Sequence, residues 1–313
     1  MLFQIVIGNV NLKEGGYVVK RVVAIVVTYN RVEYLKECVR AILKQNSPVS
    51  EVLVIDNHSS DDTQDYMESI ADNHFRVNYV RLSKNIGGSG GFFEGIKHSM
   101  SLNPDYLWIM DDDTIADQNT LSRLLDADRV LDSDWGFLSS NVRWKDGTSA
   151  KMNQLMPEKF WSEKVDDGLI AVRSGTFVSV LVKSTDVKKY GLPIPEFFIW
   201  GDDTEYTQRM SSDHQGYFVA NSHVVHKTQQ NLNVDIINEK IEKKLARYFY
   251  SYRNSFYNSR MENRGWIFFF KSLVTLTRLI KSNDRLKWKK IGMLCKGLYK
   301  GAFFNPEIRF YRS

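Results

Sequence analysis

Residues 22–57 read VVAIVVTYNRVEYLKECVRAILKQNSPVSEVLVIDN, and this stretch decides the fold class. Val22–Thr28 and Glu51–Asp56 are short apolar runs rich in β-branched residues, which is typical of strands buried on both faces. Between them, Tyr34–Lys44 carries apolar residues at helical spacing. A strand, a helix and a second strand in this order predict a parallel βαβ unit.

The same alternation continues through the first half of the chain. The pattern predicts strands at Val77–Leu82 and Tyr106–Met110 and helices at Thr63–Ala71 and Phe92–Met100, with a glycine-rich turn before the second helix. This half is therefore predicted to be α/β with a parallel sheet. Ligands of such sheets bind beyond the carboxyl ends of the strands. Polar residues follow those ends here: Thr28, Tyr29, Asn30, Asp56, Asn57 and Asp111–Asp113.

The second half has a mixed pattern that becomes helical toward its end. Phe177–Lys183, Tyr217–Ala220 and Val224–Val225 are predicted strands, and a helix is expected over Glu205–Ser211. From Glu239 onward the pattern is helical, with arginines placed among aromatic residues.

The composition is that of a globular chain of 313 residues, 43% of them apolar. That apolar fraction excludes a disordered protein. The two cysteines, Cys38 and Cys295, lie far apart and form no CxxC pair. This excludes a disulfide framework and a cysteine zinc site, and it favours a reducing compartment.

The net charge of +5 hides an asymmetry along the chain. Residues 240–313 hold 18 lysines and arginines against 4 aspartates and glutamates, a net +14, so the remaining residues carry −9. A basic, aromatic end on an acidic body suggests an anionic partner: a membrane surface, a nucleic acid or a phosphorylated acceptor.

No segment is predicted to direct secretion or to cross a membrane. The first residues lack an early basic region and a cleavage site, and the apolar stretch Trp266–Ile280 is interrupted by Lys271 and Arg278. Such a helix can lie in a membrane interface, or it can pack its apolar face on the α/β domain with its basic side in solvent, and both alternatives stay open. The apolar face would hold Trp266, Phe269, Phe270, Leu273, Thr277 and Ile280.

Three consecutive aspartates, Asp111, Asp112 and Asp113, follow the predicted strand YLWIM. With ordinary pKa values near ~3.9 they are ionised at neutral pH and repel one another. Asp111 and Asp113 would point to the same face of an extended segment, where two carboxylates can hold a hard divalent cation beside a diphosphate. The alternative is a solvated strand-to-loop junction, but a run of three acids favours the metal.

The stretch Asn85–Gly95, NIGGSGGFFEG, is a glycine-rich segment that leads into a helix. Glycines allow a ligand to approach the backbone closely, and a helix N-terminus favours an anionic group. A dinucleotide-binding loop is an alternative, with an acid about 20 residues onward to bind ribose. Phe93, however, stands where that fingerprint has glycine or alanine, so a nicotinamide-dependent oxidoreductase is disfavoured.

A second acidic cluster, WGDDTEY, spans Trp200–Tyr206. Adjacent carboxylates beside an aromatic ring at the start of a helix can supply a general base. The alternative is structural, with Asp203 capping a helix that carries Glu205 in its first turn. His226 follows a short strand, and it becomes a third metal ligand only if the fold returns it to the three consecutive aspartates.

Together these motifs resemble the inverting family-2 glycosyltransferases. That family has the GT-A fold, an α/β nucleotide-diphospho-sugar transferase fold with a Rossmann-like mixed sheet. The glycine segment, the three consecutive aspartates and the later YFYSYRN are most similar to bacterial galactofuranosyltransferases, with rhamnosyltransferases as near neighbours. The matching segments, in the family's order, are VVTYNR (26–31), VIDNHSSDDT (54–63), the glycine segment (85–95), WIMDDDT (108–114), WGDDTEY (200–206) and His226.

The resemblance implies residues for the donor and the metal. The nucleoside would be held by Thr28, Tyr29, Asn30, Asp56 and Asn57. The donor sugar-phosphate would be lined by Asn85, Gly87, Gly88 and Gly91, with Asp112 beside the donor. A Mn²⁺ or Mg²⁺ cofactor would be bound by Asp111, Asp113 and His226.

The resemblance also implies residues for the chemistry. Asp203 occupies the family's base position, and Asp202 stands where the family usually has glutamate, so either neighbour is a candidate for the base. Trp200 and Glu205 would contact the acceptor.

The expected organisation has three parts. Residues 1–20 form an N-terminal hairpin or extension, residues 21–235 the GT-A catalytic domain, and residues 236–313 a basic, aromatic, helical C-terminal region. Within the catalytic domain, residues 21–113 would bind the nucleotide sugar and residues 114–235 the acceptor.

The implied function is metal-dependent, inverting transfer of a sugar onto a hydroxyl of a growing, lipid-linked bacterial surface polysaccharide. UDP-galactofuranose is the expected donor and dTDP-rhamnose the alternative. Such an acceptor would place the protein in the cytoplasm, peripheral on the cytoplasmic face of the cell membrane. The alternative of another class is a non-catalytic module that binds glycan or nucleic acid, although no nucleic-acid partner is expected because no such motif is found. A homo-oligomer is compatible with the sequence.

Overall fold

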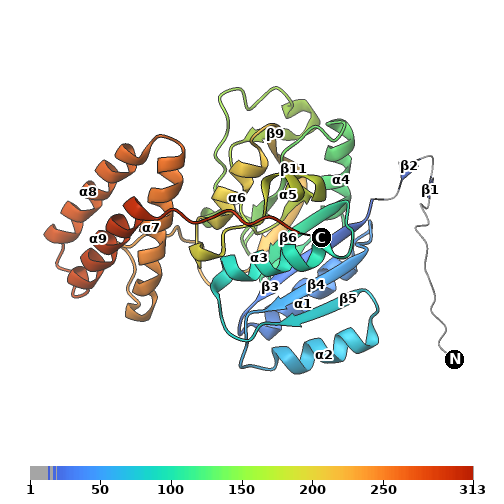
Figure 1. Ribbon diagram of the computed structural model, residues 1–313, viewed down its shortest axis with the longest axis horizontal. Coiled ribbons are helices and arrows are strands. Elements are labelled where there is room, and N and C mark those ends of the chain that lie inside the picture. The colour runs from blue at the N-terminus through green and yellow to red at the C-terminus, as the bar shows by residue number, and fades with distance from the viewer. Residues whose placement is uncertain (1–12, 15–16, 19, 313) are drawn as a thin grey trace.

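A mixed β-sheet forms the centre of the computed structural model, which describes residues 13–14, 17–18 and 20–312. The strand order is β5-β4-β3-β6-β10-β8-β11-β7, and β9 pairs with β11 (Figure 1). The strands are β3 (Val22–Thr28), β4 (Glu51–Asp56), β5 (Val77–Arg81), β6 (Tyr106–Asp111), β7 (Thr114–Ala116), β8 (Leu138–Arg143), β9 (Leu169–Val172), β10 (Val180–Lys183) and β11 (Gly216–His226).

The first half of the sheet is parallel. β3 pairs in parallel with β4 and β6, and β4 pairs in parallel with β5, which confirms the predicted βαβ pattern. Beyond β6 the directions mix, because β10 runs antiparallel to β6 while β11 runs parallel to β8. The mixed sheet is the one expected for the GT-A fold.

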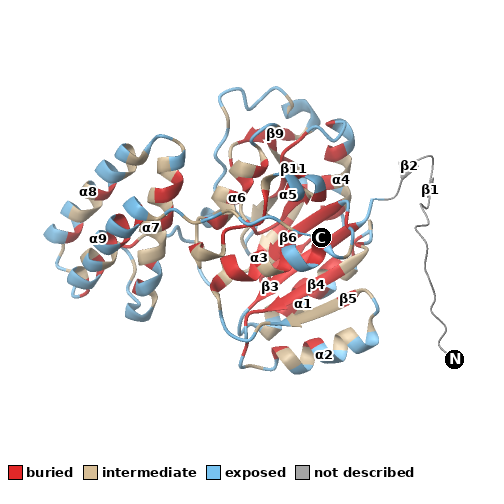
Figure 2. Ribbon diagram, viewed as in Figure 1, coloured by how far each residue is buried: buried red, intermediate tan, exposed pale blue. Residues whose placement is uncertain are grey.

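Helices cover both faces of the sheet, and the alternation of side chains along β3 decides which helix meets which face. Val22, Ala24 and Val26 pack with α1, α2 and α4, whereas Val23 and Ile25 pack with α3, α5 and α6. All seven residues of β3 are buried (Figure 2). These helices are α1 (Val32–Leu43), α2 (Thr63–Asn73), α3 (Gly87–Met100), α4 (Thr120–Val130), α5 (Ser184–Tyr190) and α6 (Asp202–Met210).

Three further helices form a small bundle beside the sheet (Figure 1). They are α7 (Leu245–Met261), α8 (Gly265–Lys281) and α9 (Lys287–Phe303), and they share a core of their own that includes Leu245, Leu279 and Leu294. The chain then returns to the sheet, where the Leu192 N–H donates a hydrogen bond to the Arg309 carbonyl (2.8 Å). The C-terminal region is therefore joined to the α/β part of the chain at both ends.

The apolar face predicted for α8 points outward. Trp266 is 65% exposed and Phe270 59% exposed, whereas the side of α8 that carries Ser272 and Leu279 is buried against the bundle. The alternative in which the apolar face packs on the catalytic domain is therefore wrong. Among the described residues, no helix combines the length and apolar character needed to cross a membrane.

Several element boundaries differ from those predicted. The glycine-rich segment is not a turn, because α3 already begins at Gly87. Helix α6 begins at Asp202, so Asp203 lies inside its first turn instead of capping it. The two short strands predicted near 217–225 are one strand, β11, whose pairing with β8 shifts register between Val219 and His223.

Only part of the N-terminal segment is described. β1 (Lys13–Glu14) pairs antiparallel with β2 (Tyr17–Val18). The other positions of the expected hairpin or extension, apart from residue 20, lie outside the described residues.

Candidate active site

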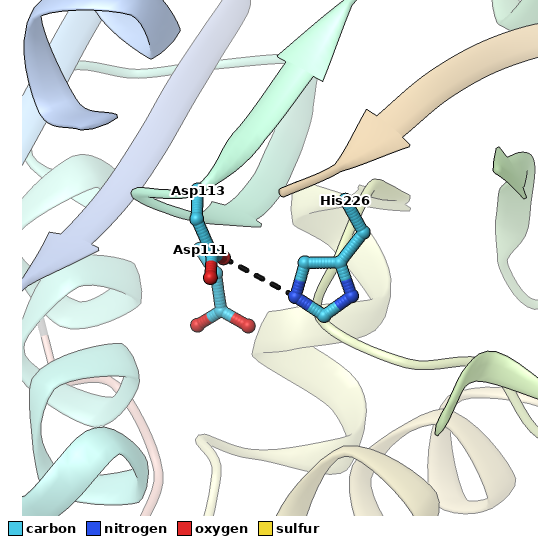
Figure 3. A group of neighbouring side chains, drawn as sticks. All are labelled: Asp111, Asp113 and His226. Atoms are coloured by element: carbon cyan, nitrogen blue, oxygen red, sulfur yellow. Dashed lines mark ion pairs between the residues drawn. The ribbon is translucent and has the colours of Figure 1, made fainter. Parts of the chain in front are cut away.

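Asp111, Asp113 and His226 come together at the carboxyl end of the parallel strands (Figure 3). One ligand atom from each lies within 4.8 Å of the others. Register explains the return of His226, because β11 pairs with β7 so that His226 stands opposite Thr114. The Lys227 N–H also donates to the Asp113 carbonyl (2.8 Å). His226 therefore lies close enough to Asp111 and Asp113 to be a third ligand.

The two aspartates meet through a turn and not through alternation along a strand. β6 ends at Asp111, and the chain turns at Asp112 and Asp113 before β7 begins at Thr114. The expectation of one extended segment was wrong, although its consequence, two carboxylates at one place, is correct.

The chemistry of this group fits a divalent cation. His226 Nδ1 lies 2.9 Å from the amide oxygen of Asn153, which can only accept, so Nδ1 carries a proton. Nε2 lies 3.2 Å from Asp113 Oδ1, a buried oxygen with no other hydrogen-bond donor among the described residues, and when Nε2 carries no proton it presents a lone pair to that oxygen. Two acceptors that face each other require a cation or an extra proton between them.

Burial and like charge act differently on the neighbouring carboxyl groups. Burial, with the charges of Asp113 and Asp112, raises the pKa of Asp111 well above its usual range. Burial would also raise the pKa of Asp113, but His226 and Arg31 outweigh it and hold that pKa below its usual value. Asp111 is therefore the ligand that gains most from a nearby positive charge.

Asp112 is tied to β3 and not to the metal group. Its carboxylate accepts from Thr28 Oγ1 (2.8 Å) and Arg31 Nη1 (3.2 Å), and Arg31 also reaches Asp113 Oδ2 (2.8 Å). Burial still raises the pKa of Asp112 to about 6. Arg31 and Asn153 were not among the predicted site residues, because only the fold shows that they contact this group.

The predicted nucleoside residues surround the ends of β3 and β4. Tyr29 is exposed, whereas the others already bond within the protein. Asp56 accepts from the Ser59 N–H (2.7 Å) and Tyr79 Oη (2.7 Å). Asn57 donates to the Gly87 carbonyl (2.8 Å) and accepts from the Ile86 N–H (2.9 Å). In the same way, Asn30 accepts from the Ser60 N–H (2.6 Å).

The glycines of α3 have different surroundings. Gly87 has φ +81°, and a Cβ built there would lie 2.2 Å from the Phe198 carbonyl oxygen. A Cβ on Gly91 would meet Val27 at 2.5 Å. A Cβ on Gly88 would meet nothing within 4 Å. Gly88 therefore leaves open space at the start of α3, where Asn85 Oδ1 accepts from the Gly87 N–H (2.8 Å).

The second acidic cluster lies at the start of α6. Burial and the charge of Asp203 raise the pKa of Asp202 to about 7, and burial raises the pKa of Asp203 to about 6 although the Thr204 N–H opposes it. Trp200 packs beside Tyr248 of α7, with ring centroids 5.6 Å apart. Glu205 holds Arg209 through two contacts of 2.7 and 2.9 Å, so its predicted contact with an acceptor stays a prediction.

Comparison with known proteins gives a consistent result. Residues 23–183, more than half of the chain, match the family described as glycosyl transferase family 2. The galactofuranosyltransferase GlfT1 of Mycolicibacterium smegmatis is 26% identical over 214 residues, which cover 60% of this chain and 65% of that protein. The chain thus spans just under two thirds of the length of this relative.

Solved structures resemble the whole chain in fold. A mannosyltransferase, PcManGT from Pyrobaculum calidifontis in complex with GDP-Man and Mn²⁺, gives a TM-score of 0.54 at 15% identity, covering 91% of this chain and 73% of that one. GalNAc-T7 with UDP, GalNAc and Mn²⁺ gives 0.60 at 14% identity, covering 94% and 56%. At such low identity these likenesses establish the GT-A fold alone.

We expect Mn²⁺ to stabilise the protein through the three ligands. A free concentration 100 times Kd adds about 2.7 kcal/mol to the free energy of unfolding, which raises Tm by about 4 °C for a chain of this size. Asp113→Ala and His226→Ala should each remove most of the shift in a thermal unfolding assay.

The matched control for the metal prediction is His214→Ala. His214 also pairs with an aspartate, Asp134, at 2.5 Å, but it does not belong to the group of three ligands. This variant should keep the full Mn²⁺ shift. A shift that survives in both His226→Ala and Asp113→Ala would place the cation elsewhere.

We expect alanine substitutions at two adjacent glycines of α3 to have different effects on the free energy of unfolding. Gly87→Ala should lower the free energy of unfolding by about 2 kcal/mol or more, from backbone strain and overpacking against Phe198. Gly88→Ala should leave it unchanged or raise it by up to about 1 kcal/mol, because alanine restricts the unfolded chain. Urea unfolding of both variants measures this, and equal losses would contradict an open face at Gly88.

Proposed function

The chain belongs to glycosyl transferase family 2, and we propose that it is a metal-dependent inverting glycosyltransferase that transfers a sugar from a nucleotide donor to a sugar hydroxyl. The observation that carries the proposal is the meeting of Asp111, Asp113 and His226 at the carboxyl edge of the sheet. The N-terminus of α3 lies beside that edge, linked to it through the hydrogen bond from Asn57 to Gly87. A cation site and a helix N-terminus at one edge suit a nucleoside diphosphate.

The donor would extend from β3 and β4 to α3. The exposed ring of Tyr29 is free to stack on the nucleoside. Thr28 holds the side chain of Asp112, while Asn30, Asp56 and Asn57 hold the surrounding backbone and turns. The open face at Gly88 leaves room for the sugar-phosphate, with Asn85, Gly87 and Gly91 shaping the approach. Residues 21–113 are thus proposed as the donor half and residues 114–235 as the acceptor half.

Asp111, Asp113 and His226 would hold Mn²⁺ or Mg²⁺, with Asn153 fixing the tautomer of the imidazole. When bound, the cation supplies positive charge that stabilises the departing nucleoside diphosphate. Two solved structures of similar fold contain Mn²⁺, which favours a divalent metal here. Asp112, held by Thr28 and Arg31, stays beside the donor.

Asp203 is the proposed general base. It accepts the proton of the acceptor hydroxyl at a carboxylate oxygen, and the resulting nucleophile attacks the anomeric carbon from the face opposite the diphosphate, which inverts its configuration. A pKa of about 6 suits this role, because a base is most effective when its pKa lies near the working pH. Asp202 is the alternative base, and Trp200 and Glu205 are proposed to contact the acceptor.

Galactofuranose from UDP-galactofuranose is the first donor to test, because the relative from Mycolicibacterium smegmatis is a galactofuranosyltransferase. The proposed acceptor is a growing, lipid-linked bacterial surface polysaccharide. Rhamnose from dTDP-rhamnose is the second donor, since rhamnosyltransferases are near neighbours of the galactofuranosyltransferases that the motifs resemble. The intact acidic clusters disfavour a non-catalytic module.

The proposal is tested with a panel of nucleotide sugars, assayed for Mn²⁺-dependent nucleotide release and for sugar transfer. We expect transfer from UDP-galactofuranose that stops on chelation.

Asp203→Asn should reduce transfer by about 10²-fold or more, because a general base typically contributes 10²–10⁴-fold, while donor binding stays nearly intact. Asp202→Asn is the matched variant at the neighbouring position, and it tests which of the two aspartates is the base. If Asp202→Asn alone abolished transfer, Asp202 would be the base, and full activity in Asp203→Asn would remove Asp203 from the mechanism.

The pH dependence of the rate is a second test of an aspartate base on α6. The base must be ionised to accept a proton, so the rate should rise with pH through its pKa. With a pKa of about 6 for Asp203 or about 7 for Asp202, the acid limb of kcat/KM should fall between pH 6 and 7. An ordinary aspartate would place it near ~3.9.

We also propose that α8 binds an anionic membrane surface and places the protein on the cytoplasmic face of the membrane. Its outward face exposes Trp266, Phe269, Phe270, Val274 and Ile280. Exposed lysines and arginines, Lys271, Arg278 and Lys281, lie on the same helix. Aromatic side chains with flanking basic residues are typical of helices that lie in a lipid interface.

Flotation with vesicles tests the membrane proposal. The protein should float with phosphatidylcholine vesicles that contain phosphatidylglycerol and much less with phosphatidylcholine alone, since each basic residue near an anionic surface contributes about 1 kcal/mol. Trp266→Ser with Phe270→Ser should reduce flotation. Phe75→Ser is the control, because Phe75 is 89% exposed but lies near the end of α2. Equal flotation with both kinds of vesicle would contradict an anionic partner.

A further inference from the structure

The loop Phe197–Gly201, which leads into Asp202 and Asp203, has an unusual backbone. Phe198 has φ 64° and ψ −55°, and the Ile199 N–H donates to the Phe197 carbonyl (2.7 Å). These values define a γ-turn of the rare, strained type. Trp200 follows with φ 64° and Gly201 with φ 87°. Aromatic residues in this region of φ are held there only by strong surrounding contacts.

Helix α7 supplies those contacts from one side. The amide Nδ2 of Asn254 lies 3.0 Å from the Phe197 carbonyl, 3.0 Å from the Ile199 carbonyl and 2.7 Å from the Trp200 carbonyl. Asn254 has no exposed surface. It is the hydrogen-bond donor to the Ile199 and Trp200 carbonyls among the described residues.

Two other side chains of α7 donate hydrogen bonds to the two ends of the loop. Arg253 Nη2 donates to the Glu196 carbonyl (2.6 Å) and the Phe197 carbonyl (3.1 Å). Asn258 Nδ2 donates to the Gly201 carbonyl (2.8 Å). The face of α7 that carries these three side chains therefore binds the loop from Glu196 to Gly201.

Helix α3 contacts the loop from the other side. The carbonyl of Phe198, which α7 does not bind, accepts from the Ser89 N–H (3.3 Å). The close approach at Gly87 involves the same carbonyl oxygen. The loop thus lies between α7 and α3, the helix proposed to bind the donor. It leads into α6, which carries the proposed base.

We propose that Asn254, with Arg253 and Asn258, is a positioning residue that holds this loop so that the carboxylate on α6 faces the donor on α3. The inference rests on the proposed function. It assigns a role to the YFYSYRN motif (248–254), whose last two residues are Arg253 and Asn254. None of these side chains needs to touch the substrate, because they act through the backbone that leads to Asp203.

The test compares Asn254→Leu, which keeps the branched shape and the number of heavy atoms but removes the amide, with the full-length wild-type protein. A base displaced by about 1 Å reduces the rate by about 10²-fold, so kcat for transfer should fall by about that factor. The KM for the donor should stay within about threefold, because β3, β4 and α3 keep their residues. Amide hydrogen exchange over residues 197–203 should accelerate at least tenfold, since opening of this segment becomes easier.

The matched control is Asn73→Leu. Asn73 also donates its amide to a backbone carbonyl, that of Ser69 (2.7 Å), but it lies exposed at the end of α2. It should leave kcat, KM and exchange over 197–203 unchanged. If Asn254→Leu does not fold, Asn258→Leu removes the single bond to Gly201 and should give a smaller loss of kcat with the same unchanged KM.

The outcomes separate this inference from the proposed function. If the wild-type protein transfers sugar but Asn254→Leu keeps kcat within threefold, or loses donor binding in proportion, the positioning role is overturned. If exchange over 197–203 does not change, the inference is likewise overturned. If the wild-type protein transfers from no nucleotide sugar, the proposed function fails, while faster exchange in Asn254→Leu would still support the holding of the loop by α7.

Discussion

Negative charge held at one edge of the sheet is the constraint on which the site depends. When ionised, Asp111, Asp112 and Asp113 carry three negative charges, and the positive charge of Arg31 balances one of them. Two unit charges 4 Å apart interact by about 4 kcal/mol at an effective dielectric constant of 20, so the remaining two are costly. With Nε2 free to bind a metal, His226 does not offset them, because its one proton is then directed to Asn153. The charge left over is −2, which the proposed divalent cation would neutralise.

The second constraint is how closely two helices, α3 and α7, approach the loop before α6. Gly87 allows α3 to reach the Phe198 carbonyl, and no residue with a Cβ fits there without displacing that oxygen. On the far side, α7 approaches with asparagine and arginine, which satisfy carbonyls that a strained turn leaves unpaired. Gly87 therefore allows α3 to approach the loop from one side, and Asn254 donates hydrogen bonds to the carbonyls of the loop from the other side.

The sequence was sufficient for the parallel half of the sheet, because runs such as Val22–Thr28 are buried on both faces and show it in their composition. It was insufficient where tertiary packing overrides local preference. Glycine is a poor helix former, so the start of α3 at Gly87 follows only from its packing on Val27 and Phe198. The return of His226 depends on the register and irregular pairing of β11, which no local pattern specifies.

Polar contacts between distant segments were the hardest to anticipate. A buried asparagine within an aromatic helix could equally be a core residue bonded to its own helix, and Asn254 differs only because its partners are carbonyls of Phe197, Ile199 and Trp200. Those bonds cross the boundary predicted at residue 236. A C-terminal region that merely attached the protein to a surface would not need to satisfy the backbone next to Asp203. The geometry therefore argues that the bundle and the sheet form one unit, in which the proposed surface attachment by α8 and the proposed support of the loop by α7 reside in the same small bundle.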